Sequence, residues 1–437
     1  MRSPVLISAL VAALMLLPCR SGFAAGASDD GAAGNAFSYN VQALLFAGAQ
    51  YPSDSTQNPD NAFLRLPKYA GDVQIRPDFF FETASLSAVF KPRATVSYAW
   101  WQDGVTRGET DSTSRAFVNE WRVQAPVNPS LFLSFGKEKL LWGSSFLVSP
   151  SNMLFRDTEK VNPKTEVEGK YLARMMYLPD NTVTITVISE TQKEDNLPGG
   201  SSSPLRALKV EMTGASSQIS LIAYQQRHGS ARLGSYGQWT ASDATVLYFD
   251  GLVSKGTDGL YPVRDPNNPL GGTLAEKYAA SGRTFTTVTA GGSYSFLTGQ
   301  IVSAEFLYNG KGYNDQEAKD YYELRRNAGS SLFDSGLING LSRQFLSGTL
   351  DRSSDFLRRY YVMAQVQERE IGNVADVMLR YVHSLEERAG QASTILEWRM
   401  SDKLLFFNIN SIAVGGHDTE FNSILSRSYL AGVEMHF

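Results

Sequence analysis

The last nine residues of the chain, from Tyr429 to Phe437, alternate in polarity without a break. Apolar or aromatic side chains occupy every second position up to Phe437, and Gly432, Glu434 and His436 lie between them. A period of two puts these two sets of side chains on opposite faces of a β-strand. The chain is therefore predicted to end in an amphipathic strand that runs to its final, aromatic residue.

The same alternation recurs along the chain, from Phe37 onward, in segments of roughly ten residues. We place about eighteen segments, or roughly sixteen to twenty if a pair has been merged or divided. Their length fits a strand that crosses a membrane, which needs about 9–11 residues. Proline cannot donate a ladder hydrogen bond, so the second segment is started after Pro77. It is set at 79–90, and the third is set at 94–102.

The connections between the segments alternate in length. Every second connection is short and rich in turn formers, as at 91–93 and 401–402, and most of the others are long, as at 52–78. A soluble β-sandwich has no reason to alternate its loops, whereas a membrane barrel has short periplasmic turns and long extracellular loops. The pattern predicts an all-β, transmembrane antiparallel β-barrel of about 18 strands over residues 37–437.

Two stretches resemble parts of known outer-membrane proteins. The strand ending at Phe437 resembles the closing strand of bacterial outer-membrane β-barrels, and 136–152, with Gly-Lys…Trp-Gly…Pro-x-Asn, resembles a pattern of several porin-like families. The resemblance implies a barrel in the outer membrane of a Gram-negative bacterium, in contact with lipid and lipopolysaccharide. It also implies that the barrel assembly machinery reads the strand ending at Phe437, and it leaves a homo-oligomer open.

The start of the chain has the layout of a targeting segment. A basic start precedes an apolar run that is too short to span a bilayer as a helix, and small residues follow it. This layout predicts a signal peptide over 1–27, cleaved after Ala24 or Ala27, and a short periplasmic segment over 28–36.

Composition limits the partners of the mature chain. Cys19 is the one cysteine and lies in the predicted signal peptide, so no disulfide is expected and a closed sheet must supply the stability. The formal net charge of −4 gives no reason to expect a nucleic acid partner.

Charged side chains gather on one face of the predicted strands. In 112–125, Glu120 and Arg122 oppose Trp121 and Val123. A Lys or Arg on the lipid face costs about 2–4 kcal/mol at the midplane, so the charged faces are expected to line a water-filled lumen. Their mixed signs fit either an ion-pair network in the wall or a field across the channel. The pore-lining candidates are Glu120, Arg122, Glu168, Lys170, Arg174, Lys209, Glu211, Glu305, Asp376, Arg380, Glu397 and Arg399.

The connection 143–164 separates the fifth predicted strand, 130–142, from the sixth, 165–178. In general porins the loop after the fifth strand folds into the lumen, so the resemblance makes the charged residues here candidates for a constriction. A plain surface loop is the alternative. The constriction candidates are Arg156, Asp157, Glu159, Lys160 and Lys164.

The connection 312–355 is too long for a passive loop. Good helix formers follow Asp315, which can cap a helix over 316–327. Such a helix could cover the mouth of the barrel as a lid or contact an outside partner. Its expected packing face is formed by Tyr321, Leu324 and Arg325.

The sequence gives no sign of an enzyme. The four histidines are scattered, with no pair at metal-ligand spacing, and there is no Gly-x-Ser-x-Gly elbow, so neither a metal nor a cofactor is predicted. The function expected is porin-like, passive diffusion of small hydrophilic solutes or ions. The alternatives are an export barrel, for example for a polysaccharide, and a scaffold around a partner protein.

Overall fold

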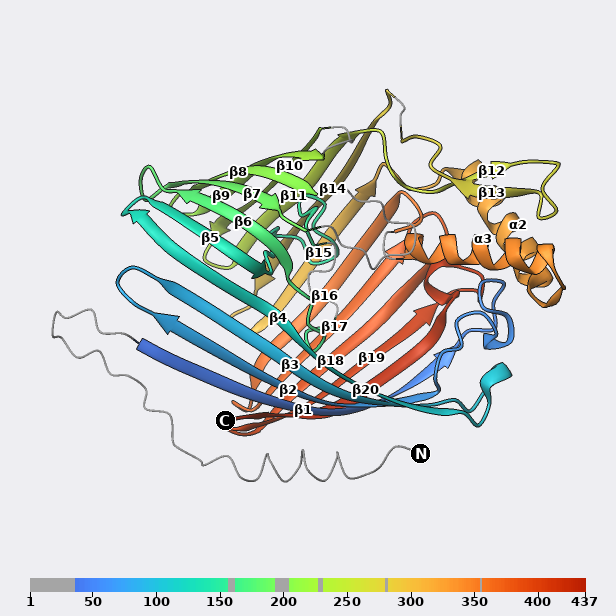
Figure 1. Ribbon diagram of the computed structural model, residues 1–437, viewed down its shortest axis with the longest axis horizontal. Coiled ribbons are helices and arrows are strands. Elements are labelled where there is room, and N and C mark those ends of the chain that lie inside the picture. Colours follow the sequence, from blue (N-terminus) through green and yellow to red (C-terminus); the bar gives the residue numbers. More distant parts are fainter. Residues whose placement is uncertain (1–35, 156–161, 193–203, 227–230, 280–281, 354–355) are drawn as a thin grey trace.

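The computed structural model of the chain describes residues 36–155, 162–192, 204–226, 231–279, 282–353 and 356–437. In this part, eighteen strands form one closed antiparallel sheet, because β1 (Ala36–Pro52) pairs with both β2 (Tyr69–Glu82) and β20 (Leu425–His436) (Figure 1). The predicted barrel and its strand number are confirmed. The other barrel strands are β3 (Ser87–Trp100), β4 (Thr110–Asn128), β5 (Leu131–Glu138), β6 (Lys170–Tyr177), β7 (Val183–Glu190), β8 (Leu205–Thr213), β9 (Ser217–Gln226), β10 (Arg232–Ser242), β11 (Thr245–Lys255), β14 (Thr284–Ser295), β15 (Gln300–Asn309), β16 (Tyr360–Ile371), β17 (Ala375–Ser384), β18 (Ala389–Ser401) and β19 (Leu404–Val414).

The C-terminal strand closes the barrel, as its alternation predicted. Leu45 of β1 stands opposite Val433 of β20, and the backbone N–H of Phe437 donates to the Val41 carbonyl oxygen at 3.0 Å. At Gly432 the seam is so close that an added Cβ would collide with the Leu45 carbonyl oxygen. A side chain at this position would therefore push the first and last strands apart.

The second and third strands differ from the prediction. The predicted strand 79–90 spans the turn 83–86 between β2 and β3, and the predicted turn 91–93 lies inside β3. Pro77 is tolerated inside β2 because the β2–β3 ladder is interrupted beside it, between the Ile75–Ala94 and Phe79–Phe90 pairs. Proline is excluded only from a continuous ladder, and the ladder has a gap at this point.

The two ends of the barrel carry different connections. Short turns, such as 83–86 and 129–130, lie at the end that we call the turn end, and the helices lie at the other, which we call the loop end (Figure 1). The elements outside the barrel wall are α2 (Asp315–Ser330), α3 (Leu337–Ser353), the hairpin β12 (Tyr261–Arg264) and β13 (Gly272–Ala275), and the short helices η1 (Pro59–Asn61), η2 (Gly104–Thr106), η3 (Ser331–Phe333) and η4 (Glu420–Asn422).

The helix α2 confirms the helix predicted over 316–327, although Asn314 caps it rather than Asp315. The Asn314 side chain accepts from the Glu317 N–H at 2.8 Å, and the Glu317 carboxylate accepts from the Asn314 N–H at 3.0 Å, which is a capping box. The predicted packing face is buried. The second helix, α3, was not predicted, because its glycines and β-branched or hydroxyl residues weaken the helical pattern.

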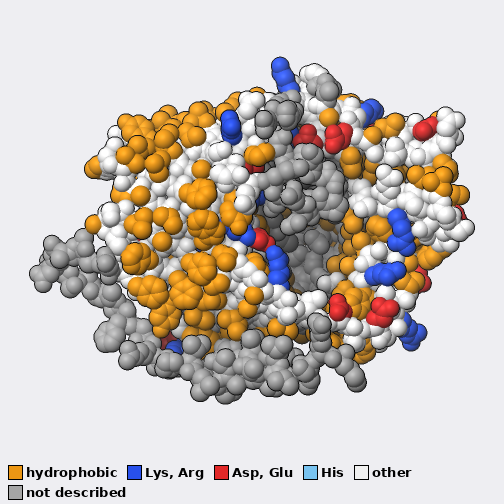
Figure 2. Space-filling model, in the orientation of Figure 1, with side chains coloured by type: hydrophobic (Ala, Val, Ile, Leu, Met, Phe, Trp, Pro, Cys, Tyr) orange, Lys and Arg blue, Asp and Glu red, His pale blue; other side chains and the backbone are white. Residues whose placement is uncertain are grey.

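The outer surface of the barrel is apolar (Figure 2). Leu221, Trp239 and Trp398 are each about half exposed, whereas Ser220 and Asp250, on the opposite face of the wall, are fully buried. This is the apolar-out, polar-in alternation of a barrel in lipid. Among the described residues, no helix is long and apolar enough to cross a membrane.

Candidate functional site: the lumen and its inward segment

The connection between β5 and β6 runs inside the barrel. Both neighbouring strands are shorter than predicted, since β5 ends at Glu138 and β6 begins at Lys170. We call the described part of this connection, residues 139–155 and 162–169, the inward segment. Its contacts reach strands on several sides of the lumen, and they fix where it lies.

Glu305 of β15 anchors the first part of the inward segment. Its carboxylate accepts from Ser145 Oγ at 3.0 Å, from the Leu147 N–H at 2.9 Å and from the Phe146 N–H. Glu305 is almost fully buried, and three donors compensate the loss of its hydration. The predicted lumen-facing residue Glu305 therefore binds the backbone of the inward segment.

Asp250 of β11 anchors the next turn, through the Ser151 N–H at 2.7 Å. The Ser151 carbonyl oxygen accepts from Tyr224 of β9 and from the indole N–H of Trp142. Gly143 has φ of +103°, and an added Cβ would collide with the side chains of Ser149 and Asp250. Trp-Gly in the sequence pattern is thus explained by the fold of this segment.

Asn152 explains the last position of the same pattern. Its amide donates to the Leu140 carbonyl oxygen at 3.0 Å and its side-chain oxygen accepts from the Phe155 N–H at 3.1 Å. The side chain therefore ties two parts of the inward segment together.

Lys164 ties the last part of the inward segment to the wall strands β18 and β20. Its ammonium lies 2.6 Å from Glu397 of β18 and 2.9 Å from Glu434 of β20, and its side chain is about one-tenth exposed. Of the five predicted constriction residues, Lys164 alone is described by the structure. Arg156, Asp157, Glu159 and Lys160 lie outside the described residues.

Most of the other predicted lining residues form ion pairs within the wall or with the inward segment. The prediction that Glu168 lies on a wall strand is wrong, because this residue belongs to the inward segment. Lys209 also faces the Trp142 and Tyr236 rings. The pairs are Glu120–Lys91, Glu168–Arg115, Glu168–Lys137, Lys170–Glu190, Arg174–Glu138 and Lys209–Glu211.

Four predicted residues stand apart from this network. Asp376 accepts from the Glu370 N–H at 2.7 Å and Arg399 lies 3.4 Å from the Asn373 carbonyl oxygen, so both serve a turn at the turn end. Arg380 donates to Gln365 at 2.9 Å inside the wall. Arg122 is placed beside the inward segment, with its Nε buried and without a hydrogen-bond partner among the described residues.

Sequence reasoning missed a second ionic anchor of the inward segment. Glu166 accepts from Arg93 through both carboxylate oxygens, at 2.6 and 2.8 Å, and lies 3.6 Å from Arg76. Asp78 lies 2.9 Å from Arg93 on the other side. The prediction placed Arg93 in a turn, and the Lys-Pro-Arg sequence carried no signal that its side chain enters the lumen.

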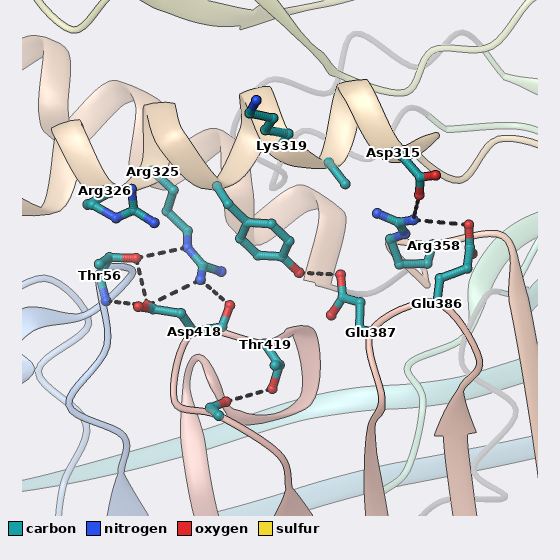
Figure 3. A pocket seen from close by; sticks show the side chains of 13 residues that line it. Thr56, Asp315, Lys319, Arg325, Arg326, Arg358, Glu386, Glu387, Asp418 and Thr419 are labelled. Carbon is teal, nitrogen blue, oxygen red and sulfur yellow. Dashed lines mark hydrogen bonds and ion pairs between the residues drawn. The ribbon is translucent and has the colours of Figure 1, made fainter.

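A cavity of about 430 Å³ lies at the loop end, between α2 and the turns that follow β17 and β19 (Figure 3). Arg325 of α2 donates to the Asp418 carbonyl oxygen at 2.5 Å, and Arg358 lies 2.5 Å from Asp315 and 3.1 Å from Glu386. Burial raises the pKa of Asp418, but hydrogen bonds from Thr56 and the charge of Arg325 outweigh it and hold this pKa below its usual value. These pairs dock α2 onto the rim of the barrel.

A second group of contacts docks the same helix. Glu387 accepts from the Tyr322 hydroxyl of α2 and, at 3.1 Å, from the Glu420 N–H. Glu420 in turn accepts from the Leu357 N–H at 2.7 Å and from the Tyr361 hydroxyl at 2.5 Å. Burial, together with the charge of Glu387, raises the pKa of Glu420 to about 8.

In the part of the chain that the structure describes, no cluster of three or more His, Cys, Asp or Glu residues is arranged to hold a metal ion. The polar groups of the lumen bind one another and the inward segment. Such an arrangement can position a segment and sort solutes by charge.

Comparison with known proteins supports the same fold. No family model matches the chain, and no curated protein sequence matches it. Among solved structures, OccK7 (OpdD) of Pseudomonas aeruginosa has a TM-score of 0.55 at 10% identity, covering 93% of this chain and 99% of that one. OccAB1 of Acinetobacter baumannii has a TM-score of 0.54 at 10% identity, with 91% and 96% covered. The outer membrane protein OprD of P. aeruginosa has a TM-score of 0.51 at 9% identity, with 92% and 95% covered. With these neighbours and a closed sheet of eighteen strands, the chain has the fold of a porin-like outer-membrane β-barrel.

Proposed function

We propose that the barrel is a passive channel for small hydrophilic solutes or ions, narrowed by its inward segment. Outer-membrane barrels have short turns on the periplasmic side and longer loops outside, so the turn end would face the periplasm and the loop end the cell exterior. The observation that carries the proposal is the anchoring of the inward segment to several wall strands, through Glu305, Asp250 and Glu434. A segment held in this way is a fixed element of the lumen and can set both its width and its charge.

Lys164 is the residue we propose for charge selection. Its ammonium is shared by Glu397 and Glu434, so replacing it with methionine removes the positive charge between these two carboxylates. We expect Lys164→Met to raise the cation-to-anion permeability ratio by about twofold or more, because uncompensated carboxylates attract cations into a narrow pore. Lys164→Arg keeps the charge and should keep the preference.

The experiment is single-channel recording of the refolded protein, with reversal potentials in a salt gradient. Lys319→Met is the matched control, since it removes the same charge from the exposed surface of α2 at the loop end. Stable conductance steps with a shift confined to Lys164→Met would support the channel. A folded protein that stays silent in the bilayer would remove the proposal and favour an export or scaffold barrel that needs a partner to open.

A further inference from the structure

One stretch of the barrel wall lacks a strand on one side. β4 pairs with β3 from Trp100–Thr110 down to Ser87–Gln124, but its pairing with β5 covers only Trp121 to Asn128. The half of β4 near the loop end, 110–118, therefore has no ladder partner on that side among the described residues. Consecutive side chains over 111–116 are all exposed, which indicates that both faces of this stretch are free.

Residues 110–118 of β4 lack ladder partners because the next strands are short. The strands β5 and β6 both stop early, and the chain between them turns into the lumen as the inward segment. The last described contacts to the backbone of the β4 edge are the Gly169 N–H to the Asn119 carbonyl oxygen at 3.1 Å and Lys137 Nζ to the Val118 carbonyl oxygen at 2.8 Å. Figure 1 shows β4 continuing past the ends of β5 and β6.

This lateral opening lies at the height of the lipid-facing side chains. On β3, Ala94, Val96 and Tyr98 stand beside Ala116, Ser114 and Ser112 of β4, across the ladder that does form. Tyr98 is about half exposed, as expected for an aromatic at the membrane interface. An unpaired strand edge is not tolerated in hydrocarbon, so the described edge of β4 needs hydrogen-bond partners such as water from the lumen or polar head groups.

The lumen side of the opening carries more positive than negative charge. Glu168 pairs with both Arg115, at 3.1 Å, and Lys137, so one carboxylate serves two cations. The Lys137 side chain also lines a cavity of about 190 Å³ on the lumen side. The charged residues lining that cavity are Lys91, Glu120, Arg122, Lys137, Glu138 and Lys139, four cations and two carboxylates.

We propose that this opening is a lateral route between the lumen and the outer leaflet for anionic, single-chain amphiphiles. The charged head would follow the hydrated edge of β4, past Arg115 and Lys137, while the apolar chain stays beside the lipid-facing side chains of β3. The inference deepens the proposed channel function, because it adds a class of solute and a second exit to the same lumen.

The test closes the opening covalently. Arg115→Cys and Glu168→Cys are combined, with Cys19 replaced by serine, and joined by a reducible bismaleimide. Proteoliposomes hold trapped albumin, and a pyrene-labelled alkyl sulfonate is placed in the outer leaflet. Capture of the label by the albumin reports transfer. The control pair, Ser393→Cys and Ser411→Cys, bridges two strands that are already paired, with their hydroxyl oxygens 3.3 Å apart.

We expect the unlinked protein to transfer the sulfonate about tenfold faster than empty vesicles, and the 115–168 link to abolish this gain until it is reduced. The 393–411 link should change nothing. Transfer that continues in the linked protein, or that is lost equally with the control link, would overturn the lateral route. Conductance of the same proteins tests the channel separately, so each proposal can fail without the other.

Hydrogen exchange of the unmodified protein gives an independent check that needs no variant. Every second amide in 111–118, the set that points away from β3, should exchange about 100-fold faster than the amides of β3, because no ladder partner faces it among the described residues. Equal protection of the two strands would show that the β4 edge is covered and would overturn the opening.

Discussion

Glu420 is a carboxylic acid placed where its charged form is costly. Its pKa of about 8 lies well above the ordinary value of 4.5, because of burial and the neighbouring charge of Glu387. The groups that face it are Glu387, Tyr361 and Arg358, and Tyr322 of α2 reaches the same site through Glu387. The pKa of Glu420 is higher in the folded protein than in the unfolded chain, so its protonated form stabilises the fold. This stabilisation is complete below about pH 4.5 and is lost as the pH rises to about 8.

We therefore expect the docking of α2 to weaken between pH 5 and 8.5, as Glu420 loses its proton beside Glu387. In Glu420→Gln this pH dependence should be largely absent, a difference of about 4 kcal/mol at most, because the amide does not titrate. The measurement is hydrogen exchange of the α2 amides, corrected for intrinsic rates, at both pH values. Glu323→Gln, an exposed carboxylate on the same helix, is the control, and an unchanged pH profile in Glu420→Gln would contradict the assignment.

At the scale of elements, the inward segment shows what a sequence pattern can and cannot reveal. The pattern Trp142-Gly143…Asn152 marked the segment correctly, because the turn at Gly143 and the amide of Asn152 are local requirements. The residues that hold it inside, Glu305 and Asp250, come from strands more than ninety positions away. Alternation placed Glu305 on the inner face, whereas Asp250 was not among the predicted lining residues. Nothing local indicates which segment either residue meets.

The same reasoning explains the errors in the strands. Alternation placed most strands correctly, since each side chain must face either lipid or lumen. It failed at β2 and β3, where Pro77 and Pro92 sit beside interruptions of the ladder, and at β6, which begins only at Lys170. Those features depend on which strands are neighbours and on where the ladder stops, and a single strand's sequence does not carry that information.

Releasing one end of the inward segment should change the channel in a defined way. Glu305→Ala removes the acceptor for Ser145, Phe146 and Leu147, and each hydrogen bond to a buried charge contributes about 1.5–3 kcal/mol. We expect larger and noisier conductance in single-channel records, with the barrel still folded on a gel. Glu211→Ala is the control, because that carboxylate bonds to Ser220 and Tyr236 of the wall. A quiet, unchanged conductance in Glu305→Ala would show that the segment does not define the pore.

At the scale of the molecule, stability rests on closure. The described barrel residues are held by strand ladders around a complete ring, except along 110–118 of β4, and the last strand completes it against β1. The end of that strand is therefore needed twice, once in the finished wall and once, we propose, when the assembly machinery reads the chain. These two roles make different demands on Phe437.

Deleting Phe437 should separate these roles. Phe437 is nearly half exposed and contributes one backbone hydrogen bond to Val41, so the folded wall loses little without it. We expect refolding into detergent, followed by heat-modifiable migration on a gel, to be close to that of the full chain. In cells, however, the folded fraction in the outer membrane should fall by about tenfold, if the terminal aromatic is the signal that the machinery binds. Phe437→Trp keeps an aromatic and should restore assembly. Trp398→Ala, which removes an exposed aromatic elsewhere on the outer surface, should leave assembly intact.

Equal losses in the two assays would mean that Phe437 acts through stability alone. Normal assembly without Phe437 would mean that the machinery reads another part of β20.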